Sequence, residues 1–116
     1  MKGLGSDIIE VERIEASIQR YGDRFLERLF TTAEQAYCNR FRDAARHYAG
    51  RFAAKEAIAK ALGTGFGDQL SWLDIEILND EQGKPIPHLR EGILKGTLEL
   101  SISHCKAYAL AVAIIH

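Results

Sequence analysis

Residues 51–65 predict a helix around which the rest of the fold has to be arranged. From 51 to 62 the chain is rich in Ala, Leu, Lys and Glu and contains no Gly or Pro. Gly63 then supplies the left-handed residue at which helices commonly end. Helical spacing puts one apolar stripe on the inward face: Ala54, Ala57, Ile58, Ala61 and Leu62.

Glu56 and Lys60 lie one turn apart on the opposite side of this predicted helix, among small alanines. One interpretation is an ordinary surface ion pair, worth roughly 0.2–0.5 kcal/mol. The other is a pair of charges that small neighbours leave open to a bulky ligand. The helix alone favours the first interpretation, so the remainder of the chain has to decide between them.

Length and charge narrow the class of protein. The chain has 116 residues, 47% of them hydrophobic, which predicts a single domain over residues 1–116 with its own core. A net charge of −1 argues against nucleic acid or an anionic membrane as a partner. Between residues 40 and 60, however, six Lys and Arg face two Asp and Glu. This local excess suits a small polyanion such as a nucleotide, or simply a solvated helix face.

Cysteine usage and hydropathy predict a cytoplasmic protein. Cys38 and Cys105 have no metal-binding spacing and are too few for a disulfide framework, so reduced thiols are expected. The N-terminus has no secretory hydrophobic region, and no run approaches the roughly 18 apolar residues that span a membrane.

A strand is predicted over residues 3–11, and it carries one carboxylate among apolar side chains. Burying a lone charge is costly, so Asp7 must be paired, hydrogen-bonded or metal-bound, unless it is a turn or cap residue before the next helix. The apolar residues expected to be buried are Leu4, Ile8, Ile9 and Val11.

Two amphipathic helices are predicted next, over residues 12–21 and 24–30, with an interruption at Gly22 and Asp23. Their arginines fall on or near one side, which indicates either a recognition surface or a solvent-facing helix. These residues are Arg13, Arg20, Arg24 and Arg28.

Thr31 followed by Glu34 is a capping-box signature, and it predicts a further helix through about Phe41. Ala36, Tyr37 and Phe41 are expected to face inward. The long helix should begin near residue 43, and His47 in its first half is interpreted as structural rather than as a ligand.

The remaining sequence predicts strands. Residues 75–77 alternate apolar and acidic, residues 79–85 are dense in turn formers, and a second strand at an edge should follow over 85–89. A short helix is expected at 90–95. Alternation then predicts a strand at 97–103, and the final strand over 108–115 is apolar on both faces, as in a central or intersubunit strand. Helices first and strands last indicate an α+β fold, with the long helix packed on a C-terminal antiparallel sheet.

Four stretches, in this order and at these separations, resemble the small bacterial type of 4′-phosphopantetheinyl transferase, the holo-[acyl-carrier-protein] synthase family. The resemblance covers nearly the whole chain, and the Arg-Phe-Ala-Ala-Lys-Glu-Ala core of the long helix is its most specific part. Two departures are Cys105, where a more polar residue is expected, and residues 85–96, which lack family features. The stretches are Gly3-Leu4-Gly5-Ser6-Asp7-Ile8-Ile9 with Arg13-Ile14, residues 51–65, residues 79–85, and Ser101-Ile102-Ser103-His104 with Tyr108-Ala109.

The resemblance implies Mg²⁺-dependent transfer of phosphopantetheine from coenzyme A to a serine of apo-acyl carrier protein, with release of adenosine 3′,5′-bisphosphate. The modified carrier protein would serve fatty acid biosynthesis. Asp7 and Glu56 would hold the metal, which usually takes only one or two protein carboxylates. Lys60 would neutralise phosphate charge, and Glu56 is the candidate proton acceptor. The implied contacts for coenzyme A are Arg51, Lys60, Gly83, Lys84, Pro85, Ser103 and His104.

The resemblance also implies a homotrimer with sites between subunits, in which Arg13, Arg20, Arg24 and Arg28 face the acidic carrier protein. Two rival hypotheses are a non-catalytic oligomer that binds a nucleotide or another anion, and a purely structural oligomerisation domain. The first does not explain a carboxylate at Asp7. The second leaves the Glu56 and Lys60 pair and residues 83–85 without a role.

Overall fold

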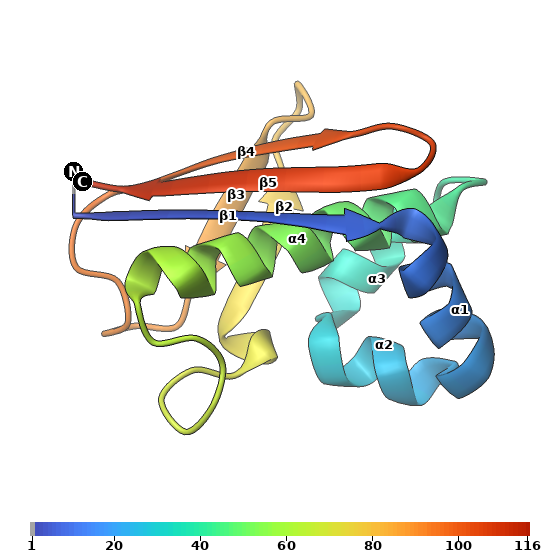
Figure 1. Ribbon diagram of the computed structural model, residues 1–116, viewed down its shortest axis with the longest axis horizontal. Helices are drawn as coiled ribbons and strands as arrows, with labels where there is room; N and C mark the ends of the chain where they lie inside the picture. Colours follow the sequence, from blue (N-terminus) through green and yellow to red (C-terminus); the bar gives the residue numbers. More distant parts are fainter. Residues whose placement is uncertain (1) are drawn as a thin grey trace.

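The computed structural model describes residues 2–116, which form the predicted α+β arrangement (Figure 1). Four α-helices, one short 3₁₀ helix and five strands follow one another along this part of the chain. Their bounds are β1 Gly3–Glu10, α1 Val11–Tyr21, α2 Asp23–Leu29, α3 Thr32–Cys38, α4 Ala44–Leu62, the 3₁₀ helix η1 Trp72–Asp74, β2 Ile75–Asn79, β3 Pro85–Leu89, β4 Leu98–His104 and β5 Tyr108–Ile115.

A three-stranded antiparallel sheet in the order β1-β5-β4 covers one side of α4, while α1, α2 and α3 gather at one end of that helix (Figure 1). The last strand, β5, is central, as its apolar sequence predicts. The register pairs Asp7 with Ala111, and Ala111 with Ile102 of β4. The strands β2 and β3 form a separate antiparallel pair joined by the predicted loop.

The long helix α4 begins after residue 43 and ends at Gly63, whose φ of 83° is left-handed as predicted. It is buried on more sides than the single predicted stripe. Ala53, Lys55 and Ala59 are also buried, because the sheet covers one side of α4 and the other helices and β2 pack on much of the remainder, which leaves Lys60 exposed. Alanines are frequent at these contacts because small side chains let neighbouring elements approach closely, but the larger Tyr48, Lys55 and Ile58 are buried as well.

Two glycines let β1 lie directly against α4. A Cβ atom on Gly5 would lie 2.7 Å from the Ala61 nitrogen and closer still to the Ala57 carbonyl oxygen, and Gly3 would meet the Ala61 carbonyl in the same way. Gly3, Gly5 and Asp7 alternate along β1, so all three face the helix. The close approach therefore brings the Asp7 carboxylate to the helix surface.

Gly5→Ala is expected to lower the free energy of unfolding by about 2–3 kcal/mol, because the added methyl group must push two backbones apart. Urea denaturation would measure this change. The control is Gly67→Ala in the loop after α4, where a Cβ atom meets nothing within 4 Å. Equal stabilities for the two variants would contradict the close packing of β1 on α4.

Several local predictions are wrong. Residues 90–95 form a turn instead of a helix, because Gly92 adopts a φ of 90°. Helix α3 ends at Cys38, short of Phe41, and both Ala36 and Phe41 are exposed. Cys38, the last residue of α3, is buried.

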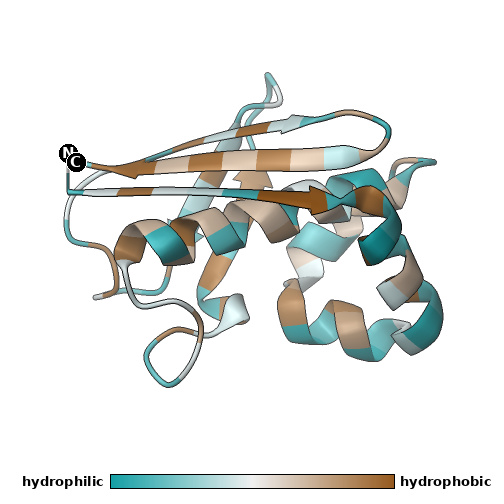
Figure 2. Cartoon of the chain, viewed as in Figure 1, coloured by the Kyte–Doolittle hydropathy of each residue, from teal (hydrophilic) through white to brown (hydrophobic). Residues whose placement is uncertain are grey.

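The outer face of the main sheet is apolar and exposed. Leu4 and Ile8 were expected to be buried, but they are 56% and 62% exposed because strand alternation turns them away from α4. Tyr108 and Leu110 of β5 are exposed beside them. Figure 2 shows hydrophobic residues along both β1 and β5.

Lys55 belongs to a buried network and does not contribute to a basic surface. Its side chain is 0% exposed, and its ammonium donates to Glu34 at 2.7 Å, to the Leu29 carbonyl at 2.7 Å and to the Trp72 carbonyl at 3.1 Å. Glu34 also accepts from the backbone N–H of Thr31, completing the predicted capping box. This network ties α4 to α3 and η1.

Candidate active site

Asp7, Glu56 and Lys60 meet where β1 crosses α4. The Lys60 ammonium donates to the Asp7 carboxylate at 3.2 Å and to the Ser6 carbonyl at 3.0 Å. Lys60 is exposed, whereas the Asp7 side chain is only 17% exposed. The sequence therefore places all three residues correctly on one helix face and the facing strand.

The pKa of Glu56 reflects its position beside a second carboxylate. Its pKa is raised first by partial burial and then by the neighbouring Asp7 carboxylate, while Lys60 opposes both effects. Two carboxylates that repel each other at the edge of the protein form an oxygen donor set that suits Mg²⁺. Residues 2–116 contain no group of three or more potential metal ligands, so water and phosphate oxygens would have to complete the coordination.

A second group of predicted residues lines a small pocket of about 130 Å³, which has room for about four water molecules. The pocket lies between α3, α4, the β2–β3 loop and β4. Its lining contains an arginine and two histidines but no carboxylate, which suits an anion. The lining residues are Tyr37, His47, Gly50, Arg51, Asn79, Gly83, Pro85, Ile102 and His104.

Arg51 has the most constrained side chain of this anion pocket. It is 4% exposed, its guanidinium lies 4.3 Å from the centre of the Tyr37 ring, and its Nη2 donates to the Asn79 side-chain oxygen. Its Nε is buried without a hydrogen-bond partner among the described residues. The positive guanidinium of Arg51, in a pocket lining without carboxylates, favours an anionic ligand.

His47 was interpreted as structural, yet it lines the anion pocket beside His104, with 5.3 Å between ring centres. Burial is the main cause of a lowered pKa at His47, and the neighbouring His104 and Arg51 add to it. The Phe41 ring stacks on the His47 ring, with 3.7 Å between ring centres. The sequence did contain a signal for His47 as a pocket residue, because it lies four residues before Arg51 and therefore on the same face of α4.

Not every predicted contact of coenzyme A lines this pocket. Lys84 is exposed on the loop, next to Gly83 and Pro85, which do line it. Ser103 pairs with Leu110 on the outer face of the sheet, whereas the preceding Ile102 and the following His104 line the pocket. Tyr37 and Asn79 are pocket residues that the sequence reasoning missed, since no local pattern distinguishes them.

The four predicted partner-binding arginines are all exposed on α1 and α2. Arg24 and Arg28 line an open groove of about 420 Å³ together with Tyr21 and Phe25. The break at Gly22 changes the helix direction, so Arg13 and Arg20 do not share this groove.

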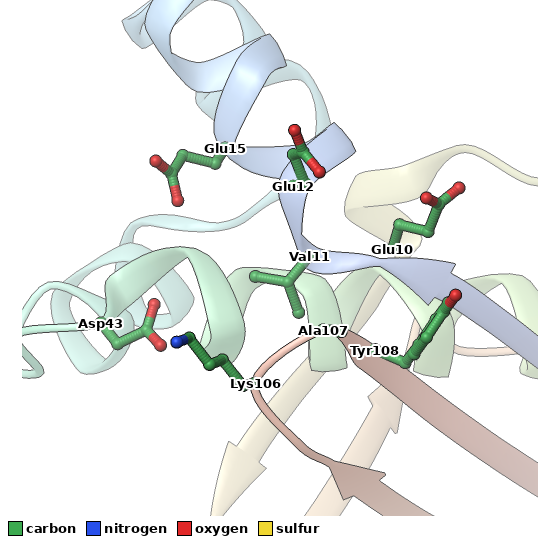
Figure 3. Close-up of a pocket in the computed structure, with 8 residues that line it drawn as sticks. All are labelled: Glu10, Val11, Glu12, Glu15, Asp43, Lys106, Ala107 and Tyr108. Carbon is green, nitrogen blue, oxygen red and sulfur yellow. The ribbon is translucent and has the colours of Figure 1, made fainter.

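A larger cavity of about 500 Å³ lies at the start of α1 and contains none of the predicted site residues (Figure 3). Most of the charged side chains that line this cavity are carboxylates, which do not suit a phosphate ligand. In Figure 3 the Lys106 amino group and the Asp43 carboxylate point toward each other. The lining residues are Glu10, Val11, Glu12, Glu15, Asp43, Lys106, Ala107 and Tyr108.

The model of the 4′-phosphopantetheinyl transferase superfamily matches residues 3–113, so the chain belongs to this superfamily. A holo-[acyl-carrier-protein] synthase of Protochlamydia amoebophila is 56% identical, covering 97% of this chain and 95% of its own. A holo-[acyl-carrier-protein] synthase of Chlorobaculum tepidum is 45% identical, with coverages of 96% and 95%.

The fold comparison agrees with the sequence comparison. The crystal structure of Helicobacter pylori holo-[acyl-carrier-protein] synthase in complex with coenzyme A has a TM-score of 0.91 at 36% identity, covering 97% of this chain and 99% of that one. The resemblance predicted from the sequence, the α+β fold and the prediction of an enzyme of this kind are thus confirmed. Separately, none of the helices within residues 2–116 is long and apolar enough to cross a membrane.

Proposed function

We propose that this protein transfers the 4′-phosphopantetheine group of coenzyme A to a serine hydroxyl of apo-acyl carrier protein. Mg²⁺ is the proposed cofactor, and adenosine 3′,5′-bisphosphate is the second product. The observation that carries this proposal is the meeting of Asp7, Glu56 and Lys60 between β1 and α4. The names of the relatives support the reaction class, and a similar Bacillus anthracis synthase structure (TM-score 0.88, 42% identity) is described in complex with CoA (3′,5′-ADP).

In this reaction the serine oxygen forms a bond to the β-phosphorus of coenzyme A while the bond from that phosphorus to the bridging oxygen breaks. Bound between Asp7 and Glu56, Mg²⁺ would supply charge neutralisation at the pyrophosphate. Glu56 accepts the serine proton, directly or through a water molecule; its raised pKa suits this exchange. Lys60 offsets negative charge on the leaving phosphate, because its exposed ammonium can turn from Asp7 toward a ligand.

A phosphate group at the nucleotide end of coenzyme A is assigned to the anion pocket. Arg51 and His104 are the proposed phosphate contacts, and the loop with Gly83, Lys84 and Pro85 would meet the nucleotide. Ser103 remains a prediction from the resemblance. A module that only binds anions would have no use for the Asp7 carboxylate, so transfer is favoured over simple binding.

Incubation of the protein with coenzyme A, Mg²⁺ and an apo-acyl carrier protein tests the proposed function. Mass spectrometry should show the carrier gaining one phosphopantetheine group, and EDTA should prevent the gain. An unmodified carrier despite tight binding of coenzyme A would support the binding module instead.

The acidic carrier protein is proposed to dock on Arg13, Arg20, Arg24 and Arg28 of α1 and α2. Charge reversal by Arg13→Glu is expected to lower kcat/KM for the carrier about tenfold while KM for coenzyme A changes less than twofold. Steady-state kinetics with each substrate varied in turn would measure both effects, and added salt should reduce the difference. Equal losses for both substrates would contradict a dedicated carrier surface.

We also propose a homotrimer, with the exposed outer face of β1 and β5 covered by neighbouring subunits. Leu110→Asp is expected to shift the protein to monomers at micromolar concentration, because a carboxylate cannot remain charged in an apolar interface. Sedimentation velocity would measure the assembly. Leu73→Asp is the control, since Leu73 is 49% exposed but lies on η1, away from the sheet. A wild-type protein that sediments as a monomer would contradict the trimer.

The single domain over residues 1–116 and a cytoplasmic location remain predictions from the sequence.

A further inference from the structure

Asn79 connects the two parts of the anion pocket. It is the last residue of β2, where the loop to β3 begins. Its side-chain oxygen accepts from Nη2 of Arg51, and its side-chain nitrogen donates to the Gly83 carbonyl at 3.0 Å. One amide group therefore joins the guanidinium on α4 to the loop that lines the same pocket.

The loop fixes which way this amide faces. Asp80 accepts from the backbone N–H groups of Gln82 at 2.9 Å and Lys84 at 2.8 Å, and the Gly83 N–H donates to the Asp80 carbonyl at 3.0 Å. The Gly83 carbonyl is thus held in place, and as an acceptor it requires the NH₂ end of the Asn79 amide. The oxygen end of the amide then points to Arg51, whose Nη2 donates to it.

Arg51 needs such a partner in order to present its free donors to a ligand. An arginine side chain loses rotamer entropy on binding, and less is lost when the planar fork is already oriented. Tyr37 supports the face of the guanidinium at 4.3 Å, but a ring face does not fix rotation within that plane. The hydrogen bond from Nη2 to Asn79 does.

We propose that Asn79 is a positioning residue for the nucleotide end of coenzyme A, which it serves by fixing the Arg51 fork to the loop at Gly83. The proposal rests on the proposed function, because that function assigns a phosphate at the nucleotide end to this pocket. Asn79 acts through Arg51, so its contribution disappears when the guanidinium is absent.

Isothermal titration with coenzyme A and with adenosine 3′,5′-bisphosphate tests the proposal in the wild type and in Asn79→Ala. Loss of one hydrogen bond to a charged group should weaken both ligands by about tenfold, and by the same factor, because both contain the nucleotide end. At saturating coenzyme A, kcat should change less than twofold, since the reacting phosphate lies elsewhere. Glu81→Gln, an exposed change in the same loop, is the matched control and should leave both affinities unchanged.

A double-mutant cycle with Arg51→Gln separates positioning from direct contact. In the Arg51→Gln background, Asn79→Ala should weaken coenzyme A less than twofold. A persisting tenfold effect, or unchanged affinity in Asn79→Ala alone, would overturn the proposal. Asn79→Ser repeats the measurement if the alanine variant melts more than a few degrees below the wild type. Failure of the wild type itself to bind coenzyme A would instead overturn the proposed function.

Discussion

Replacing Lys55 with methionine is expected to lower the free energy of unfolding by about 3–5 kcal/mol. The Lys55 ammonium makes three hydrogen bonds in a fully buried position, including one to the Glu34 carboxylate, which is itself fully buried. Methionine fits the space but leaves this carboxylate without its cation, and the Leu29 and Trp72 carbonyls without a donor. Burial lowers the pKa of Lys55, and the charge of the Glu34 carboxylate and its hydrogen bond oppose this shift.

Urea denaturation monitored by circular dichroism would measure the loss in Lys55→Met. Lys106→Met is the matched control: Lys106 is exposed in the β4–β5 turn, so its substitution should change the stability by less than about 0.5 kcal/mol. A loss below about 1 kcal/mol in Lys55→Met would show that Glu34 is satisfied without the lysine.

Asp7→Asn and Glu56→Gln are each expected to reduce the rate of phosphopantetheine transfer by about a thousandfold or more, which corresponds to about 4 kcal/mol of transition-state stabilisation. Each change keeps the shape of the side chain and removes one of the two charges proposed to hold Mg²⁺. Initial rates from carrier mass shifts would measure the loss. The control is Glu12→Gln, which neutralises an exposed carboxylate of α1. Transfer within tenfold of the wild type in either site variant would contradict the assignment.

Stability measured on the same Glu56→Gln protein separates lost chemistry from lost folding. The folded protein raises the Glu56 pKa through burial and the Asp7 charge, so it disfavours the ionised form. The stabilisation that comes with this raised pKa is fully present below the unfolded-state pKa of Glu56. It is lost as the pH rises through the folded-state pKa of Glu56. The inactive glutamine variant should therefore melt above the wild type at neutral pH, and the difference should shrink in acid.

Much of the secondary structure follows from local sequence patterns. The alanine-rich segment forms α4 and stops at Gly63, the Thr31 and Glu34 capping box starts α3, and alternation predicts β2 and β4. These features depend on residues a few positions apart, so the printed sequence contains the information needed. The predicted turn at residues 79–85 is likewise present, held by Asp80. The helix expected at 90–95 failed because its central glycine adopts a left-handed conformation.

The candidate site also has features that the sequence predicts and features that only the structure shows. The sequence and its resemblance to a known family selected Asp7, Glu56, Lys60 and Arg51 as candidates, because their residue types suit metal and phosphate binding. Only the tertiary structure shows that Lys55 and its neighbour Glu56 lie in different surroundings. Both are charged members of one helix, yet Lys55 is enclosed with Glu34 while Glu56 reaches the surface beside Asp7.

Long-range packing decided the remaining features of this protein. Asn79 bonds to a residue 28 positions earlier, and Leu4 and Ile8 are exposed because the sheet turns Gly3, Gly5 and Asp7 toward α4. Periodicity can say that a strand has two faces, but which face meets the helix depends on how closely the two backbones approach. In β1 the absence of two side chains permits that approach, and this contact brings the two carboxylates together.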